Sequence, residues 1–212
     1  MNIYFIIIIG MILFQYGLSI LVKILNLKSL NPNLPDEFSD VFDKDKYIKS
    51  QEYTKTNTNF SFLTSTFSLI VNLSFILGGF YNTIDLYVRG FGYDSEVTGL
   101  LFFGLLFVIN DLLNIPFSLY KTFIIETKYG FNKTTLKTFW MDKVKGYFLT
   151  VLIGGPVLYL ILYFFANFTE YGWLYVWIFL IAFSIIMQPI FTTFIAPMFN
   201  KFTPLEDGPL LT

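Results

Sequence analysis

Residues 3–22 form an unbroken run without a single charged side chain, and this feature constrains the fold more than any other. A helix needs about 20 apolar residues to cross roughly 30 Å of hydrocarbon, because each residue adds about 1.5 Å. Four further stretches have similar length and character: 60–80, 99–120, 147–168 and 173–195. The sequence therefore predicts an all-α fold, a polytopic membrane helical bundle with about five transmembrane helices.

The first run is interpreted as a retained anchor and not as a signal peptide. No basic residue precedes it, and no small-residue cleavage pattern follows it. The composition agrees with a membrane protein: 14% of the 212 residues are charged, against about 25% in an ordinary soluble domain. The net charge of −1 is too balanced to favour nucleic acid as a partner, so the lipid bilayer is the first partner expected.

The positive charges are distributed unevenly between the predicted spans. Loops 23–59 and 121–146 hold six Lys each and Lys201 follows the last span, whereas the other two loops hold Arg89 alone. Because cytoplasmic loops carry the excess of Lys and Arg, the sequence predicts an N-terminus outside and both Lys-rich loops and the C-terminus in the cytoplasm.

Both Lys-rich loops contain helical patterns, which predict amphipathic inner-surface helices. One begins at Pro35-Asp36-Glu37, with Phe38, Val41 and Phe42 on one face, and a second, polar helix runs toward the second span. In 133–147 the apolar residues share a face, so we expect this helix to lie along the inner surface before it turns into span four.

The third span carries a polar face, formed by Asn110, Asp111 and Asn114, within an arc of roughly 100° at helical spacing. An ionised Asp at mid-membrane costs about 2.5–3.5 kcal/mol on insertion scales, so this face is expected to meet a cavity or a partner. Two interpretations stay open. The three residues line a water-filled chamber, or they form an inter-helix hydrogen-bond cluster, with Asn72 of the second span as a candidate partner.

Three segments resemble those of a known family. The first is residues 42–54. The second is residues 116–126, continuing through 129–135 to Phe139 and Asp142, and it contains Glu126, Gly130, Phe131 and Asn132. The third is residues 195–205, which contains Pro197, Phe202 and Pro204. In order and spacing, these segments resemble the N-terminal five-helix membrane domain of the CAAX prenyl endopeptidases, integral-membrane zinc metalloproteases. The Glu…Gly-Phe-Asn-Lys pattern is the most specific of the three.

This resemblance implies proteolysis in the intact protein, a hydrolase reaction in which a zinc-bound water attacks a peptide carbonyl near the substrate's C-terminus. The family's His-Glu-x-x-His ligands cannot lie in this chain, because it contains no His. Cysteine is also absent, which excludes disulfides and thiolate ligands. We therefore expect no catalytic residue, no metal ligand and no cofactor here, and zinc only in the intact family protein.

The expected organisation is a transmembrane domain at 1–200, followed at 201–212 by the start of a connection to a catalytic domain that this chain lacks. That domain would act in cis or in trans, and this chain would supply the chamber wall and a docking surface. The alternatives are a non-catalytic membrane scaffold and a small transporter or channel subunit. The richness in Ile, Phe, Lys and Asn suggests an AT-rich genome, and hence a bacterial inner membrane in preference to the endoplasmic reticulum.

Overall fold

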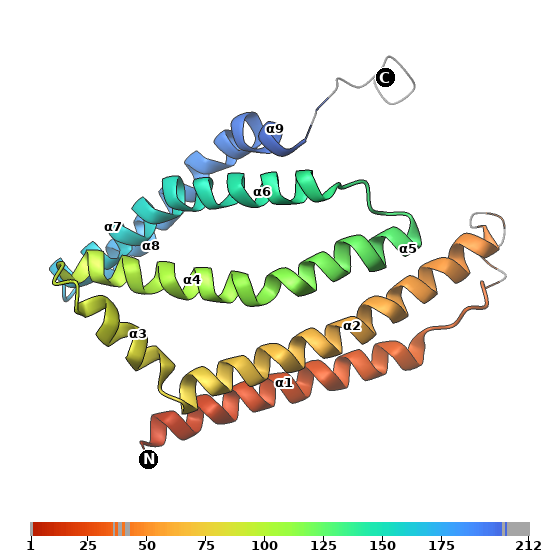
Figure 1. The fold of residues 1–212 in the computed structure, drawn as a ribbon, viewed down its shortest axis with the longest axis horizontal. Helices are drawn as coiled ribbons and strands as arrows, with labels where there is room; N and C mark the ends of the chain where they lie inside the picture. The colour runs from red at the N-terminus through yellow and green to blue at the C-terminus, as the bar shows by residue number, and fades with distance from the viewer. Residues whose placement is uncertain (1, 36, 38–39, 41–42, 201, 203–212) are drawn as a thin grey trace. The chain divides into compact units, whose positions relative to one another are not determined.

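The computed structural model describes residues 2–35, 37, 40, 43–200 and 202 (Figure 1). Within these residues, five helices are long and apolar enough to cross a membrane: Ile3–Ser29, Lys44–Leu77, Ser95–Tyr129, Leu136–Asn167 and Gly172–Phe199. This confirms the predicted polytopic helical bundle. Phe38, Val41 and Phe42, on which the first predicted inner-surface helix depends, lie outside the described residues.

The chain divides into two compact units, which are described separately. Unit 1 comprises Met1–Phe91 and Gly104–Thr134, and unit 2 comprises Gly92–Phe103 and Thr135–Thr212. Unit 1 contains α1 (Ile3–Ser29), α2 (Lys44–Leu77), α3 (Phe80–Arg89), the greater part of α4 (Ser95–Tyr120), the π-helical turn η2 (Lys121–Glu126) and α5 (Thr127–Tyr129).

Helices α1 and α2 run side by side in unit 1 (Figure 1). Each begins at a side-chain cap, because Asn2 accepts a hydrogen bond from the Tyr4 amide, and Asp43 accepts from the amides of Asp45 and Lys46. Helix α2 includes both the polar segment after residue 43 and the apolar run. The polar helix predicted to lead toward the second span is therefore continuous with that span.

Helix α2 ends where the backbone of Gly79 takes a left-handed conformation, with φ of 69°. A residue with a Cβ atom rarely adopts this conformation, so the glycine allows the chain to leave α2 and enter α3 directly. The short helix α3 was not predicted from the sequence, because it is only ten residues long and lies in the loop between two long apolar runs.

Unit 2 contains the start of α4, then α6 (Leu136–Leu149), the π-helical turn η3 (Thr150–Gly154) and α7 (Gly155–Asn167). These are followed by α8 (Gly172–Ile190), the π-helical turn η4 (Phe191–Ile195) and α9 (Ala196–Phe199). Helical structure is continuous from Leu136 to Asn167. The predicted amphipathic helix therefore runs into span four through η3, without a loop between them.

A proline follows two of the π-helical turns, η3 and η4. Pro156 follows the last residue of η3 by two positions, and Pro197 follows the last residue of η4 by two positions. Proline has no amide hydrogen to donate, and its ring crowds the carbonyl four residues earlier, which here lies inside the π-helical turn. The wider turn accommodates this carbonyl, so a long helix continues through a proline without a break.

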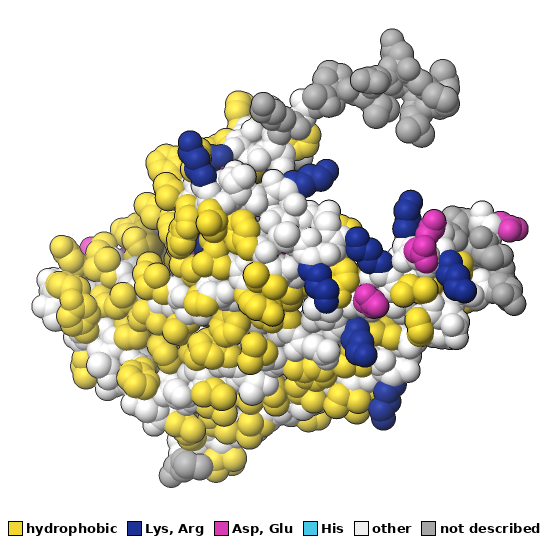
Figure 2. Space-filling model, turned by 45° about the vertical axis from the view of Figure 1, so that its right-hand side comes forward, with side chains coloured by type: hydrophobic (Ala, Val, Ile, Leu, Met, Phe, Trp, Pro, Cys, Tyr) yellow, Lys and Arg dark blue, Asp and Glu magenta, His cyan; other side chains and the backbone are white. Residues whose placement is uncertain are grey.

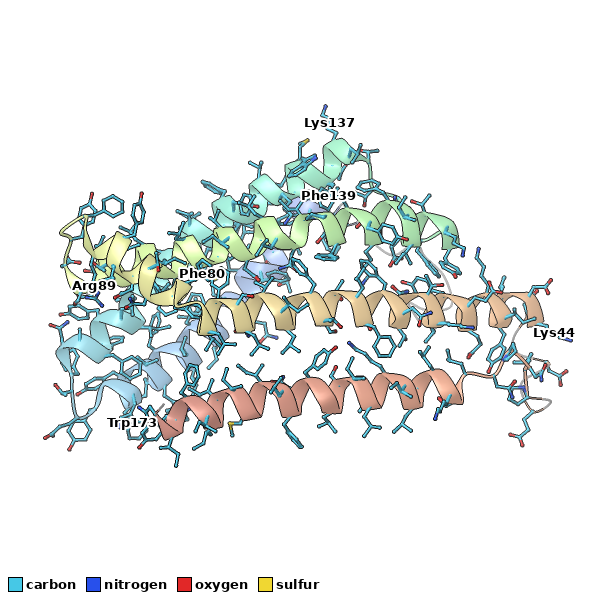
Figure 3. All side chains as sticks on the ribbon, turned by 60° about the horizontal axis from the view of Figure 1, so that its bottom comes forward. Lys44, Phe80, Arg89, Lys137, Phe139 and Trp173 are labelled. Carbon is cyan, nitrogen blue, oxygen red and sulfur yellow. The ribbon has the colours of Figure 1, made fainter. Side chains whose placement is uncertain are left out.

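Within each unit, the Lys-rich segments lie at the end opposite the interfacial aromatic residues. In unit 1, Lys44 lies at the far end of α2 from Phe80 and Arg89, and in unit 2 Lys137 lies at the far end from Trp173 (Figure 3). Figure 2 shows apolar side chains over most of the surface in view, with Lys side chains gathered beside the start of α2. This separation of charge along the helices fits spans that cross a bilayer.

Candidate functional site

The predicted polar face lies on α4 of unit 1, where two of its residues bond within the helix. The Asn114 side-chain amide donates to the Asn110 carbonyl at 2.7 Å and to Asn110 Oδ1 at 3.2 Å. Asn110 is exposed, whereas Asp111 and Asn114 are half-buried. The Asn110 and Asn114 side chains can still bind water or a ligand, because the two hydrogen bonds leave other amide donors and acceptors available.

A cavity of about 250 Å³ lies between α2, the start of α3 and α4 within unit 1. Its amide side chains are Asn72 from α2 and both Asn110 and Asn114 from α4, while the aromatic rings around it include Phe67, Phe75 and Tyr81. Two of the three residues expected to line a chamber, Asn110 and Asn114, are in the wall of this cavity, and Asn72 was considered only as a hydrogen-bond partner. Asp111, on the same helix, is not among the lining residues.

Within the described residues no hydrogen bond joins Asn72 to Asn110 or Asn114, and the wider inter-helix cluster stays a prediction. Asn72 is exposed, and the bonds of Asn114 run along its own helix to Asn110. The arrangement that these side chains do adopt is a shared cavity wall, in which amides from two helices face the same volume. This is the geometry expected of a hydrated surface between helices.

A second, larger groove of about 610 Å³ follows along the same two helices. Asn114 lines both hollows, so the polar surface is continuous along α2 and α4. The groove is rich in hydroxyl groups and has Lys121 at one end. Its lining residues are Tyr53, Thr54, Asn57, Thr58, Phe60, Ser61, Thr64, Asn114, Phe117, Ser118 and Lys121. Sequence reasoning did not single out this surface.

The Glu126-to-Asn132 segment attaches the end of α5 to α2. The Tyr53 hydroxyl donates to Glu126 Oε1 at 2.8 Å, and the Tyr53 ring contacts the rings of Tyr129 and Phe131, with centroids 5.2 and 4.8 Å apart. Tyr129 is buried, and its hydroxyl donates to the carbonyl of Glu52 at 3.1 Å. These contacts join residues more than 70 positions apart in the sequence.

Gly130 and Asn132 shape the end of the same helix. Gly130 is left-handed, with φ of 83°, and the amides of Phe131 and Asn132 then donate back to the carbonyl of Glu126. The Asn132 side chain donates to Thr127 Oγ1 and accepts from the Thr134 amide. This is a helix end closed by a glycine and an asparagine. The motif positions thus have a clear architectural role in unit 1.

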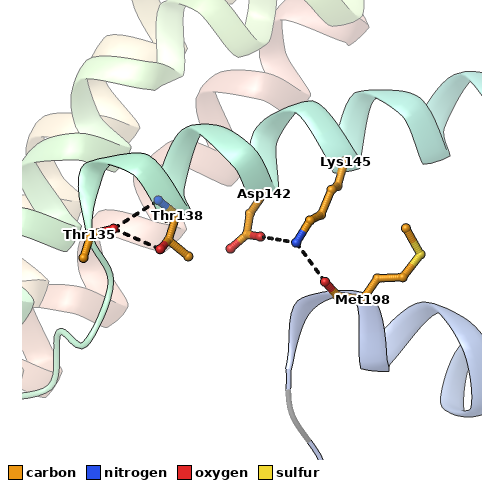
Figure 4. Close-up of polar contacts among 5 residues, drawn as sticks. All are labelled: Thr135, Thr138, Asp142, Lys145 and Met198. Atoms are coloured by element: carbon orange, nitrogen blue, oxygen red, sulfur yellow. Dashed lines mark hydrogen bonds and ion pairs between the residues drawn. The ribbon is translucent and has the colours of Figure 1, made fainter.

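The third motif lies at the exit of the last helix in unit 2. Lys145 Nζ donates to the carbonyl of Met198 at 2.8 Å and lies 3.2 Å from Asp142 Oδ1 (Figure 4). It also stands over the Phe199 ring, 5.4 Å from its centroid. Pro197 lies two positions after η4, and the wider π-helical turn accommodates the proline within the continuous helix. Phe202 is exposed, and Pro204 lies outside the described residues.

The residues present do not fit a zinc site. Among the described residues, no three His, Cys, Asp or Glu side chains come close enough to hold a metal ion. The full sequence contains no imidazole and no thiol, which are the ligands that zinc prefers. The geometry of this chain therefore offers polar cavities and helix contacts, and we derive no reaction step through a metal from it.

Comparisons with known proteins agree with this architecture. Residues 23–201 match the family described as CAAX prenyl protease N-terminal, five membrane helices. The chain is 37% identical over 188 residues to CAAX prenyl protease 1 of Saccharomyces cerevisiae, covering 84% of this chain and 41% of that protein. It is 31% identical to the CAAX prenyl protease 1 homolog of Arabidopsis thaliana, covering 96% of this chain and 50% of that protein.

The fold is also similar to a solved structure. The crystal structure of S. mikatae Ste24p superposes with a TM-score of 0.89 at 32% sequence identity, and the match covers 99% of this chain and 51% of that one. The chain therefore spans about half the length of the relatives it matches, or somewhat less. The range matched by the family, residues 23–201, contains the first two sequence motifs and residues 195–201 of the third.

Proposed function

Because this chain belongs to the CAAX prenyl protease N-terminal family of five-helix membrane domains, we propose that it is the membrane domain of a CAAX prenyl protease-like zinc metalloendopeptidase. Its helices form part of the wall of an intramembrane chamber and a docking surface for a catalytic domain, which joins it in cis or in trans. The substrate of the assembled enzyme is the C-terminal region of a peptide. The relatives' printed names support the activity class.

One observation carries the chamber part of this proposal. Asn72 of α2 and Asn110 and Asn114 of α4 line a single cavity, although nothing in their sequence spacing requires two helices to present amides to the same volume. Amides in a membrane span are expensive unless they meet water or each other. Because no hydrogen bond joins Asn72 to α4 among the described residues, water is the partner that satisfies these groups.

Thiol accessibility tests the chamber directly, because the natural chain contains no cysteine. Single cysteines at Asn72, Asn110 and Asn114 are expected to react rapidly with a small hydrophilic maleimide in intact membranes. A cysteine at Leu112, which is 58% exposed on the same helix but lies outside the cavity wall, serves as the lipid-facing control. Protection at all three Asn positions would contradict the chamber.

The orientation is a further part of the proposal, supported by the 13 to 1 distribution of basic residues. Cysteines at Lys49 and Lys137 should be protected from an impermeant reagent added outside, and those at Thr83 and Thr169 should react. Labelling of Lys49→Cys from outside would overturn it. The relatives named above come from yeast and a plant, so they lend no support to the bacterial membrane expected from composition.

A further inference from the structure

The groove between α2 and α4 has the size and position of a small-molecule site. Its volume of about 610 Å³ lies within the roughly 300–1,000 Å³ typical of ligand pockets. It extends to Lys121, which directly follows the apolar span predicted for residues 99–120. Lipid headgroups lie at the level where an apolar span ends, so the Lys121 end of this groove lies at the level of the headgroup layer.

The hydroxyl groups of the groove are mainly acceptors toward a ligand. Thr54, Thr58, Ser61 and Thr64 each donate to a carbonyl of their own helix, at 2.8 to 3.3 Å. Ser118 does the same on α4, and the Tyr53 hydroxyl donates to Glu126. Since each hydroxyl has one hydrogen and two lone pairs, the hydrogens are committed and the oxygens remain available. The groove therefore selects a ligand that brings its own hydroxyl or amine donors.

Lys121 supplies the one cation in the lining of this groove. Its side chain is exposed, and within the described part of the chain no carboxylate lies close enough to pair with it. Nearby, the rings of Phe60 and Tyr120 stack with centroids 5.2 Å apart, which places an aromatic pair beside the cation. An ammonium group at this level attracts phosphate, since basic residues at the membrane surface gain about 1 kcal/mol each from anionic lipid.

From this arrangement we propose that the groove binds the headgroup of an anionic phospholipid that carries free hydroxyl groups, of the phosphatidylinositol class. The phosphate contacts Lys121 Nζ, and the ring hydroxyls donate to the oxygens of Thr54 and Thr58, which precede the apolar run of α2. A serine headgroup brings one ammonium donor but also a carboxylate, which those acceptor oxygens repel, and a choline headgroup has no donor for them. The site depends on the end of the span alone, and it stands whether or not the chain acts in a protease.

The binding test uses the full chain purified in neutral detergent, with three dioctanoyl lipids as probes: phosphatidylinositol, phosphatidylserine and phosphatidylcholine. Native mass spectrometry or calorimetry gives each affinity. We expect phosphatidylinositol to bind more tightly than phosphatidylserine, despite equal net charge, and phosphatidylcholine to bind weakest. Equal binding of the two anionic lipids would overturn the proposal, because charge alone would then explain it.

Two lysines provide a matched pair of variants. Lys121→Gln is expected to weaken phosphatidylinositol binding by about fivefold, the factor that corresponds to about 1 kcal/mol. Lys128→Gln should leave binding unchanged, because Lys128 is exposed on the next turns of the same helix but stands over the Tyr129 ring and outside the groove. An equal loss in both variants would overturn the site and leave a diffuse basic surface in its place.

Two further measurements identify the donor pattern and the source of the phosphate. Thr58→Val preserves the side-chain shape and removes one acceptor, so it should reduce the preference for phosphatidylinositol over phosphatidylserine while the unfolding temperature is maintained. Free inositol phosphate is expected to bind more weakly than the lipid, and equal affinities would assign the groove to a soluble phosphate. Failure of this proposal leaves maleimide labelling at Asn72 and Asn110 unaffected, so it is distinguishable from failure of the chamber.

Discussion

Helix pair α1–α2 of unit 1 and helix pair α7–α8 of unit 2 are joined by different kinds of contact. Between α1 and α2, the Tyr16 hydroxyl meets Thr66 Oγ1 at 2.8 Å, and Lys23 Nζ donates to the Ser61 carbonyl at 3.1 Å and to the Ser65 hydroxyl. Between α7 and α8, aromatic rings predominate: Phe164 has the rings of Tyr175 and Phe179 within 6.1 Å.

The two helix pairs therefore associate within the hydrocarbon through different interactions. Lipid tails are as apolar as Leu, so burying apolar surface between helices provides little driving force, and packing or hydrogen bonds must supply it. Aromatic rings supply packing area, while the hydroxyl and ammonium groups of α1–α2 fix one register. A polar pair also leaves donors and acceptors that can meet water, which suits the unit that carries the cavities.

The largest effect is expected for Phe164→Ala in the aromatic pair. Phe164 is half-buried and contacts four rings, and each aromatic pair is worth about 0.5–1.5 kcal/mol beyond area burial, so the expected loss of unfolding free energy is about 2–3 kcal/mol. Phe165→Ala is the matched control, because Phe165 is the next residue on the same helix and its side chain is 54% exposed. Thermal unfolding in detergent measures both, and equal losses would refute the role of ring packing.

The next largest effect is expected for Gly130→Ala, at a helix end in unit 1. It is compared with Gly146→Ala, in a helix interior of unit 2. At φ of 83° an alanine is strained by about 1–2 kcal/mol, so the variant should be destabilised by that amount. Gly146 lies inside α6 with open space around a Cβ position, so Gly146→Ala should instead stabilise by about 0.4–1 kcal/mol. Opposite signs are expected in denaturant unfolding, and a neutral Gly130→Ala would contradict the helix-end role.

The sequence predicted the spans and the polar face better than it predicted the contacts between helices. The length of an apolar run is a local property, so the five runs could be identified directly, and Asn110 and Asn114 could be placed on one face by angular spacing alone. The bond from Tyr53 to Glu126 links positions 73 apart. Periodicity contains no information on which distant helix a residue contacts. The contact of Lys145 with the Met198 carbonyl could not be predicted for the same reason.

Two local features also could not be predicted from the hydrophobic pattern of the sequence. The ten-residue helix α3 is too short to stand out between apolar runs, although its residues are amphipathic. The continuity of the helix from Leu136 to Asn167 was not predicted, because an amphipathic segment before a span looks the same whether or not a loop separates the two. Whether a loop forms depends on contacts that the sequence alone does not reveal.

A smaller effect is expected for Tyr16→Phe in the polar pair. The ring remains and one hydrogen bond to Thr66 is lost, and such bonds between membrane helices average about 0.6 kcal/mol, with a maximum near 1.7 kcal/mol. Tyr4→Phe on the same helix serves as the control, because Tyr4 is 69% exposed. If Tyr16→Phe were as costly as Phe164→Ala, the contrast between the two helix pairs would not hold.

The smallest effect on stability is expected from acidification, which should distinguish the two helix caps. Asp43 at the start of α2 has a carboxyl group that titrates, and Thr135 at the start of α6 does not. The amides of Lys46 and Asp45 donate to the Asp43 carboxylate, and these bonds hold the pKa of Asp43 below its ordinary value of 3.8. A lowered pKa means that the cap stabilises the helix fully above that ordinary value, and that this contribution is lost as the pH falls through the folded pKa.

Hydrogen exchange at Asp45 and Lys46, corrected for intrinsic rates, should therefore lose protection on acidification, while exchange at Thr138, whose amide donates to the Thr135 hydroxyl, should not. Asp43→Asn keeps an acceptor without the charge, so it should abolish the pH dependence at Asp45 and Lys46, and persistence of that dependence would assign it to another carboxylate.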